Sequence, residues 1–303
     1  MKYKGFYNIL LSVYKENQIE IDTLMSKHIY FKVGGPADFL VNPVNVEQVV
    51  KTINLCKEHN VPYIIIGNGS NLIVRDGGIR GVVIKLCALN SIKVKGNEVK
   101  ADCGALLSDV SKAAANNKLT GFEFACGIPG SIGGAVFMNA GAYDGEMSYV
   151  IKEAEVIDDS ENLITLSKED LELGYRTSKV MKAGYVVVSA TLKLQHGIKE
   201  KIDDRISELT RRREEKQPLE FPSAGSTFKR PEGYFTGKLI QDSGLKGFSI
   251  GGAAVSEKHS GFVINKGNAT AKDVLEVIAH VQRVVKEKFG VELHTEVRII
   301  GED

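Results

Sequence analysis

A run of small residues at positions 125–143, ACGIPGSIGGAVFMNAGAY, constrains the fold of this 303-residue chain more than any other stretch. It holds glycines at 127, 130, 133, 134 and 141, and one proline, Pro129. Because glycine has no Cβ, such a backbone can approach a ligand or another element closely. The N–H groups from Gly130 to Gly133 would form a nest suited to phosphate oxygens. A connection between packed elements has the same composition, so the stretch alone leaves both interpretations open.

Composition describes an ordinary globular chain, with 43% hydrophobic and 25% charged residues, and its length predicts roughly two domains. The formal net charge of +1 argues against a general nucleic-acid-binding protein. The apolar run near the N-terminus is too short and too polar at its flanks for a signal peptide or a membrane span. We therefore expect a cytoplasmic protein that binds neither nucleic acid nor membrane.

Cysteine and histidine spacing gives no sign of a metal site. Cys56, Cys87, Cys103 and Cys126 are widely separated and form no C-x-x-C pair, which favours reduced, mostly buried thiols over disulfides or zinc. The six histidines show no H-E-x-x-H spacing. We expect no metal.

Hydrophobic periodicity in the first half predicts alternating helices and strands. Residues 1–27 are predicted to be helical, and 28–43 to form a strand, a turn and a strand. A helix over 45–60 follows, with Asn45 as its cap. The next strand ends in the loop GNGSN at 67–71. This loop lacks the third glycine of a dinucleotide-binding fingerprint and precedes a strand, so we reject a Rossmann fold while retaining phosphate binding by its amides.

The second half continues the mixed pattern. We predict strands at 91–103, 151–166 and 185–195, with a helix at 106–117. A charged helix over 199–216 ends before Pro218, and a last helix begins at the cap Thr270 and ends at Gly290. The final segment, VELHTEVRII, alternates as a strand does. Its polar face is Glu292, His294, Glu296 and Arg298, and this pattern favours a solvated edge over the floor of a polar site.

The segment SAGSTFKR at 223–230 places a hydroxyl beside two cations. Ser226 lacks the G-x-S-x-G context of a nucleophile elbow, so an acid or a hydrogen-bond donor is the better functional interpretation. A turn-forming serine next to a surface Lys-Arg pair is the alternative.

Taken together, these segments resemble the UDP-N-acetylenolpyruvoylglucosamine reductase family. The motifs that carry the resemblance are FKVGGPAD (31–38), GNGSN (67–71), GIPGSIGGA (127–135), MNAGAY (138–143), YRTS (175–178), QPLEFPSAGSTFKRP (217–231) and HTEVRIIG (294–301). They follow the family's order from about residue 20 onward, and the compact length is similar to that of the shorter, type II, subfamily. The resemblance implies an α+β fold, with a two-subdomain FAD-binding unit of the vanillyl-alcohol-oxidase (PCMH) type and a C-terminal substrate-binding domain. We assign these parts to 1–90, 91–198 and 199–303.

The resemblance also implies a reaction. NADPH, as co-substrate, reduces non-covalently bound FAD, and hydride then passes to UDP-N-acetylglucosamine enolpyruvate, giving UDP-N-acetylmuramate for peptidoglycan synthesis. A flavin is needed because protein side chains do not carry hydride. The resemblance gives no oligomeric state. Two alternatives stay open, another FAD-dependent oxidoreductase on the same scaffold and a non-catalytic protein that binds FAD or a nucleotide sugar.

By the same resemblance, Arg176 and Glu296 flank the substrate carboxylate and Ser226 is the proton donor. Arg176 would supply fixed positive charge as an enolate develops. Glu296 would donate a hydrogen bond if it is protonated, which requires a raised pKa or a strong cationic partner. Serine is a weak acid, so Ser226 needs help, for which Lys229 and Arg298 are candidates.

The resemblance assigns the remaining site residues to the cofactor or the substrate. Predicted FAD contacts are Gly67, Asn68, Gly69, Ser70, Asn71, Gly127, Ile128, Pro129, Gly130, Ser131, Gly134 and Ala135. Predicted substrate contacts are Tyr175, Arg213, Lys229 and Arg230.

Overall fold

The structure, a computed structural model, describes residue 3 and residues 5–303. The chain forms two compact units, each assembled from separate segments. The first unit comprises 1–20, 39–68 and 81–213, and the second 21–38, 69–80 and 214–303. The family-based boundaries after residues 90 and 198 rest on a different criterion and stay a prediction.

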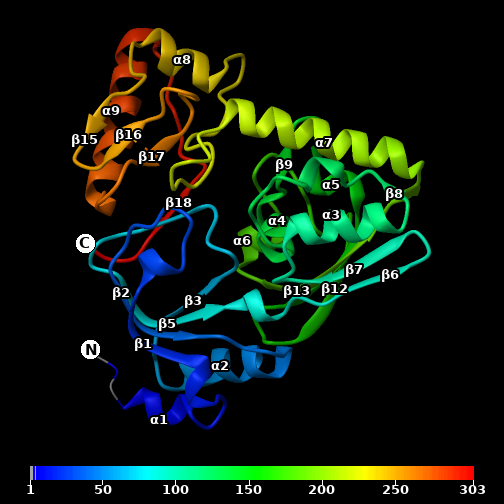
Figure 1. Ribbon diagram of the computed structural model, residues 1–303. Helices are drawn as coiled ribbons and strands as arrows, with labels where there is room; N and C mark the ends of the chain where they lie inside the picture. The colour runs from blue at the N-terminus through cyan, green and yellow to red at the C-terminus, as the bar shows by residue number, and fades with distance from the viewer. Residues whose placement is uncertain (1–2, 4) are drawn as a thin grey trace. The chain divides into compact units, whose positions relative to one another are not determined.

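The first unit contains most of the helices and strands (Figure 1). Its helices are α1 (Phe6–Leu10), α2 (Val46–Glu58), α3 (Leu107–Asn116), α4 (Ile132–Met138), α5 (Met147–Val150), α6 (Lys179–Ala183) and α7 (Lys199–Lys216), with 3₁₀ turns at Glu16–Gln18, Leu86–Ala88 and Glu123–Ala125. Its strands are β1 (Ile19–Leu24), β2 (Pro36–Val41), β3 (Tyr63–Ile66), β5 (Ile79–Lys85), β6 (Ile92–Lys95), β7 (Glu98–Asp102), β8 (Leu119–Thr120), β9 (Gly141–Ala142), β10 (Gly145–Glu146), β11 (Ile151–Ile157), β12 (Leu163–Ser167), β13 (Val186–Lys193) and β14 (Gln195–His196). Strands β1, β2 and β5 and helix α7 continue across the division between the units.

Two sheets organise this unit. The larger has the order β12-β11-β13-β7-β6 and is antiparallel throughout. The smaller has the order β1-β2-β5-β3, and its β3 runs parallel to β5, with Tyr63 opposite Val82. Helix α4, which contains the second half of the glycine-rich motif, packs against β13. The motif is therefore attached directly to the central strand of the larger sheet.

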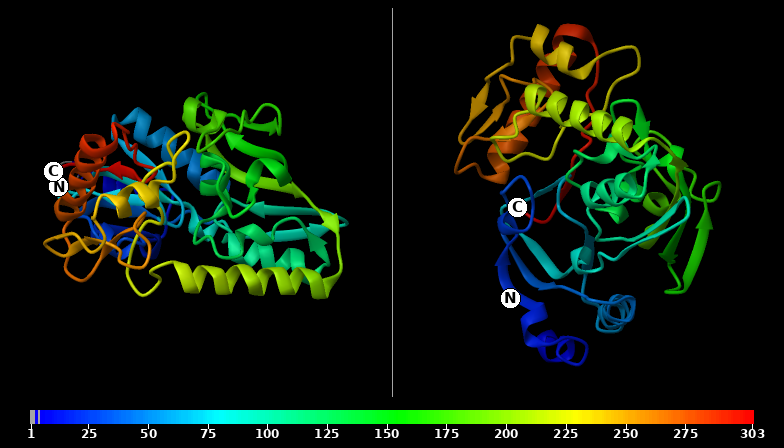
Figure 2. Two further views of the ribbon diagram at one scale, coloured as in Figure 1. Left: turned by 90° about the horizontal axis from the view of Figure 1, so that it is seen from above. Right: turned by 45° about the vertical axis from the view of Figure 1, so that its right-hand side comes forward.

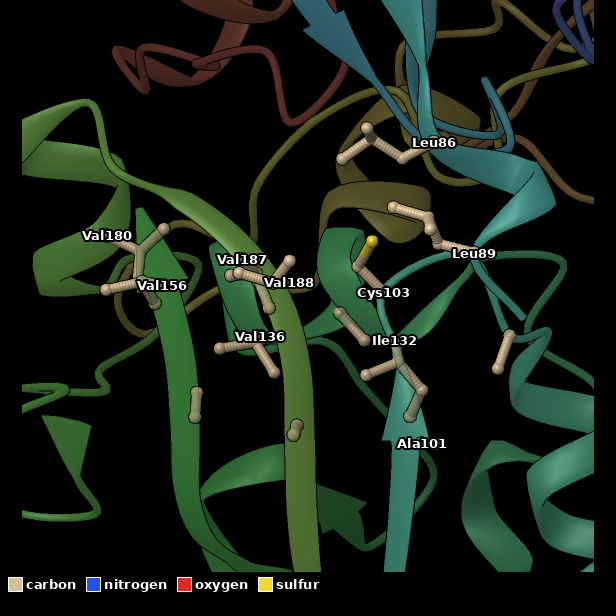
Figure 3. Close-up of a cluster of buried hydrophobic side chains, with 14 of the residues drawn as sticks. Leu86, Leu89, Ala101, Cys103, Ile132, Val136, Val156, Val180, Val187 and Val188 are labelled. Atoms are coloured by element: carbon tan, nitrogen blue, oxygen red, sulfur yellow. The ribbon is translucent and has the colours of Figure 1, made fainter. Parts of the chain in front are cut away.

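One continuous hydrophobic core fills the first unit, from Phe6 to Leu194. Figure 3 shows a part of it, where Val136 of α4 lies beside Val187 and Val188 of β13. Val136 is fully buried, and burying a side chain of this size contributes about 1.5–3 kcal/mol. The core thus holds α4, and the loop that precedes it, against the sheet.

The second unit is smaller and is built around one helix. Its elements are the 3₁₀ turn Met25–Lys27, β4 (Leu72–Val74), α8 (Thr236–Asp242), β15 (Ser249–Ile250), β16 (Ala253–Val255), β17 (Val263–Asn265), α9 (Ala271–Phe289) and β18 (Arg298–Ile300). Helix α9 packs along the antiparallel sheet β15-β16-β17, as Figures 1 and 2 show. Strand β18 pairs in parallel with β4, so residues near 72 and near 298 are neighbours.

The predicted caps are confirmed. Asn45 accepts a hydrogen bond from the Gln48 N–H at the start of α2. At α9, Thr270 and Asp273 form a capping box, and Gly290 ends the helix in the left-handed conformation at φ +69°. The charged helix over 199–216 is also confirmed, as the unbroken α7 of Figure 2.

Three predictions of secondary structure were wrong. The lead-in, of which residues 1, 2 and 4 lie outside the described residues, holds a short helix and then the strand β1 at 19–24. Before Gly34, residues 28–33 form no strand. The last predicted strand is reduced to β18, and residues 291–297 follow an irregular path in which Leu293 and Val297 are nonetheless buried. In the last case, the burial of Leu293 and Val297 outside a strand shows that tertiary packing overrides local alternation.

None of the described helices is both long enough and apolar enough to span a membrane.

Candidate active site

Two loops of the first unit, 67–68 and 127–135, lie against each other. The Asn68 amide Nδ2 donates to the Pro129 carbonyl at 2.7 Å. At Gly67 a Cβ would stand only 2.6 Å from the Ser131 hydroxyl oxygen. A side chain at 67 would therefore displace the Ser131 hydroxyl, because the two loops approach closely. Residues separated by about sixty positions form one surface.

Ser131 provides a polar atom that no protein group satisfies. Its side chain is 2% exposed, and its Oγ has no hydrogen-bond partner among the described residues. A buried hydroxyl without a partner costs free energy, so it marks a position where a ligand atom would restore the bond. This orphaned oxygen, set between two glycine-containing loops, fits the pyrophosphate of FAD.

The amides of the glycine-rich motif divide into two groups. Those of Ile132 and Gly133 donate to the carbonyls of Ala105 and Cys103, at 2.9 and 2.8 Å. The predicted continuous nest from Gly130 to Gly133 is therefore wrong, because α4 begins at Ile132 and its first amides bind the turn that follows β7. Within the part of the chain that the structure describes, no group accepts a hydrogen bond from the amides of Gly130, Ser131 and Gly134.

Arg213, predicted to contact the substrate, lies beside the glycine-rich motif. A Cβ at Gly127 would stand 2.8 Å from the Arg213 Cδ. Next to it, burial raises the pKa of the Cys126 thiol, an effect that Thr210 and Arg213 partly oppose. The thiol is thus kept neutral, and the cation is the group that faces the loop.

The remaining predicted FAD contacts play mixed roles. Ile128 donates its N–H to the Ala125 carbonyl, and Ala135 is buried inside α4. Gly69, at φ +68°, accepts from the Tyr30 N–H at 3.1 Å and has no room for a side chain beside the His28 carbonyl. Ser70 is half-buried. Gly69, Ser70 and Asn71 belong to the second unit, so the loop GNGSN is shared between the units.

Arg176 occupies a tight turn of the first unit. Its own φ is +53°, and Gly174 and Thr177 pair across the turn. The guanidinium donates to the carbonyls of Asn139 and Gly141, at 3.4 and 3.3 Å, and lies 5.1 Å from the centre of the Tyr175 ring. Tyr175 is 53% exposed. These two contacts orient the guanidinium.

Ser226 and Glu296 lie on two neighbouring segments of the second unit. The Glu296 N–H donates to the Thr227 carbonyl at 2.8 Å, and the Lys229 N–H donates to the His294 carbonyl at 2.8 Å. Thr227 is fully buried, and its hydroxyl accepts from the Val263 N–H at 3.0 Å. Ser226 itself is exposed, directly after Gly225 at φ +75°. Backbone pairing therefore brings the predicted acid and the predicted carboxylate onto adjoining segments.

The other predicted cations of the second unit flank this pairing. Arg230 donates from Nε to the Tyr234 carbonyl at 3.1 Å and lies 4.0 Å from the centre of the Phe235 ring. Lys229 is half-buried, whereas Arg298 is exposed at the start of β18. The predicted polar face is not one strand surface, because only Arg298 of its four residues lies in a strand, and Glu292 forms an ion pair with Lys286.

Sequence reasoning gave no role to two residues that hold the site, Thr227 and Asn139, and assigned a third, Asn71, to FAD. Thr227 and Asn71 fix the Glu296 backbone; Asn71 Nδ2 donates to the Glu296 carbonyl at 3.1 Å. Asn139 ends α4 and supports the Arg176 turn. Its signal was present in the sequence, since asparagine after a helix and before small residues is typical of a left-handed helix end.

Comparisons with known proteins point to one family. Residues 37–167 match the family described as FAD binding domain, and residues 217–300 match the UDP-N-acetylenolpyruvoylglucosamine reductase, C-terminal domain. The UDP-N-acetylenolpyruvoylglucosamine reductase of Clostridium perfringens strain SM101 is 71% identical, over 100% of this chain and 99% of that protein. The enzyme of the same name from Clostridium beijerinckii is 64% identical, over 100% of both.

A solved structure gives the same result. The crystal structure of UDP-N-acetylenolpyruvylglucosamine reductase from Thermus caldophilus superposes with a TM-score of 0.80 at 35% identity. It covers 93% of this chain and 99% of its own.

Proposed function

We propose how the residues of this chain, which belongs to the UDP-N-acetylenolpyruvoylglucosamine reductase family, divide the work of the family's reaction. The chain is an FAD-dependent oxidoreductase that uses NADPH to reduce UDP-N-acetylglucosamine enolpyruvate to UDP-N-acetylmuramate, a step of peptidoglycan precursor synthesis. This membership decides among the three functional hypotheses in favour of the reductase. The roles of the individual residues are proposals.

FAD would be held by the loop GNGSN and by the glycine-rich motif. The amides of Gly130, Ser131 and Gly134 and the buried Ser131 hydroxyl would bind the pyrophosphate, and Arg213 would add positive charge beside Gly127. When bound, FAD accepts a hydride from NADPH and delivers it to the enolpyruvyl double bond. The glycine-rich motif thus positions the cofactor and takes no part in proton transfer.

The three catalytic residues act on the substrate. As hydride reaches the terminal carbon, negative charge develops towards the carboxylate, and Arg176 stabilises it with a charge held by two backbone carbonyls. Glu296 would donate a hydrogen bond to the same group if it is protonated. Ser226 then gives a proton to the other carbon, which completes the saturated lactyl ether. The adjoining positions of Ser226 and Glu296 support this assignment more than any other observation.

Ser226 requires neighbours that stabilise its alkoxide. Lys229 lies on the same segment and Arg298 begins β18, and we assign this supporting role to them. Tyr175 and Arg230 are proposed to contact the nucleotide part of the substrate, whereas Arg213, also a predicted substrate contact, is assigned to FAD and Lys229 to Ser226. The exposed Tyr175 ring and the Arg230–Phe235 pair offer the flat faces and charge that a uridine diphosphate needs.

We extend the proposal to domains and location. Residues 1–90 and 91–198 would form the FAD-binding subdomains and 199–303 the substrate-binding domain. The two family matches support the boundary after residue 198, since they fall on either side of it. A cytoplasmic location follows from the need for NADPH.

Replacing Ser226 with alanine tests the proposed acid. Reduction of bound FAD by NADPH should persist, while reoxidation by the enolpyruvyl substrate falls by about 10²–10⁴-fold. Stopped-flow absorbance of the flavin measures both half-reactions. Ser223→Ala, on the same segment and half-buried, is the matched control and should leave both rates unchanged. An unaltered second half-reaction in Ser226→Ala would remove this residue from the mechanism.

A further inference from the structure

Asn139 ends α4 in an unusual conformation. Its φ and ψ are +47° and +59°, in the left-handed region, and its side chain is fully buried. A non-glycine residue adopts this conformation at a cost, although asparagine tolerates it better than most. Nothing in the reaction so far uses this residue. It belongs to the motif MNAGAY, which the sequence singled out without giving it a role.

Every hydrogen-bonding atom of the Asn139 side chain is used. Nδ2 donates to Glu146 Oε1 and to the Gly174 carbonyl, both at 3.1 Å, while Oδ1 accepts from the Ser148 N–H at 2.9 Å. One carboxamide therefore ties the end of α4 to two other segments, the turn at 145–148 and the loop at 174–177. Buried bonds of this kind have no water to replace them.

The loop at 174–177 is the one that carries Arg176. Gly174, which accepts from Asn139, pairs with Thr177 across the turn. The Arg176 guanidinium then returns to the backbone carbonyls of Asn139 and Gly141. Asn139 thus holds Arg176 twice, through the loop with its side chain and through the guanidinium with its carbonyl.

We propose that Asn139 is a positioning residue for Arg176, which sets where the guanidinium charge stands relative to the substrate carboxylate. The inference rests on the proposed function of Arg176. Asparagine suits the position because it combines two donors, one acceptor and tolerance of positive φ. Aspartate would set a carboxylate against Glu146 Oε1 and the Gly174 carbonyl. Glycine would keep the backbone conformation and the carbonyl but lose all three side-chain bonds.

Asn139→Gly is accordingly the most informative variant. It should retain FAD and its reduction by NADPH, while the rate of reoxidation by substrate falls by about 10²-fold, as expected for a catalytic charge displaced by about 1 Å. A milder variant, Glu146→Ala, removes one acceptor of Asn139 and should lower the same rate by a smaller factor. Asn97→Gly is the control, because it also removes an asparagine bond to a backbone carbonyl, at 3.1 Å from Leu194 O, and should leave both half-reactions unchanged.

A double-mutant cycle distinguishes positioning from general support of the fold. If Asn139 acts through Arg176, Asn139→Gly should have little further effect on reoxidation in the Arg176→Ala background. Two results would overturn the inference and leave the role of Arg176 intact. The first is that the losses of the two single variants add in the double variant. The second is that Asn139→Gly reoxidises at the normal rate although Arg176→Ala does not. Full activity of Arg176→Ala would instead overturn the proposed function. If Asn139→Gly fails to fold, the same cycle is run with Glu146→Ala, and additivity there overturns the inference equally.

Discussion

Arg176 and Glu296 are held by different kinds of contact. In the first unit, a fully buried asparagine side chain braces the Arg176 turn and two carbonyls receive the guanidinium. In the second unit, Glu296 is held through its backbone, by Thr227 and by the parallel pairing of β4 with β18. A turn that depends on one side chain is sensitive to a single substitution, whereas a paired backbone distributes the same task over many bonds.

Among the variants of the two units, Arg176→Ala should slow reoxidation by substrate the most. We expect reoxidation by substrate to fall by about 10²–10³-fold, the usual loss when one preorganised stabilising group is removed. Arg176→Lys should lose less, since it keeps the charge without the planar fork. The control is Arg212→Ala, which removes a guanidinium that lies 4.9 Å from the Tyr143 ring centre. Equal rates for Arg176→Ala and the unaltered protein would contradict the assignment.

Gly134→Ala extends the comparison to a residue that is proposed to bind FAD through its backbone amide alone. A Cβ at 134 meets no protein atom within 4 Å, so the apoprotein should be unchanged or more stable by roughly 0.5–1 kcal/mol. The same methyl would stand where FAD is proposed to lie, and crowding of about 1–3 kcal/mol corresponds to binding that is weaker by about 5- to 150-fold. Calorimetric titration with FAD measures this.

Gly133→Ala serves as the contrasting variant for that experiment. Its Cβ would stand 2.9 Å from the Cys103 Cβ, so it should lower the melting temperature of the apoprotein itself. Unaltered FAD affinity in Gly134→Ala would show that this face of α4 does not meet the cofactor.

Asn71→Ala is the counterpart of Asn139→Gly in the second unit. It removes one hydrogen bond to the Glu296 carbonyl, worth about 0.5–1.5 kcal/mol, so reoxidation by substrate should slow by no more than about tenfold. The loss should be smaller than in Asn139→Gly because Thr227 still accepts from the Glu296 N–H. A loss as large as that of Asn139→Gly would remove the distinction between the two units.

The smallest expected effect concerns acid stability of the second unit. Backbone N–H groups of Thr270 and Gly252 hold the pKa of Asp273 below its usual range. A depressed folded-state pKa adds stability above the unfolded value, near pH 4, and this stability is lost as pH falls through the folded value. Circular dichroism melts between about pH 3 and 6 should therefore depend less on pH in Asp273→Asn. Asp204→Asn, on the exposed side of α7, should show the same pH dependence of the melting temperature as the unaltered protein. The same pH dependence in all three proteins would show that Asp273 makes no such contribution to stability.

The sequence predicted best where local chemistry is sufficient. Asn45, Thr270 and Gly290 were found as helix ends because capping depends only on neighbouring backbone groups. The glycine-rich motif was also found, but not the helix within it. Seven residues of α4 are stabilised by Val136 against β13 and by amides bonded to Ala105 and Cys103, and no local pattern reveals such contacts.

The sequence by itself determined the family and the residue types that carry the chemistry, because the motifs and their order are properties of the sequence. Only the tertiary structure decided which amides of the glycine-rich motif remain available and that Ser131 is buried without a partner. It also decided that Asn139 supports Arg176, across 37 positions, and that Asn71 supports Glu296, across 225. The physical reason is that hydrogen bonds between distant segments depend on packing, which periodicity and propensity do not encode.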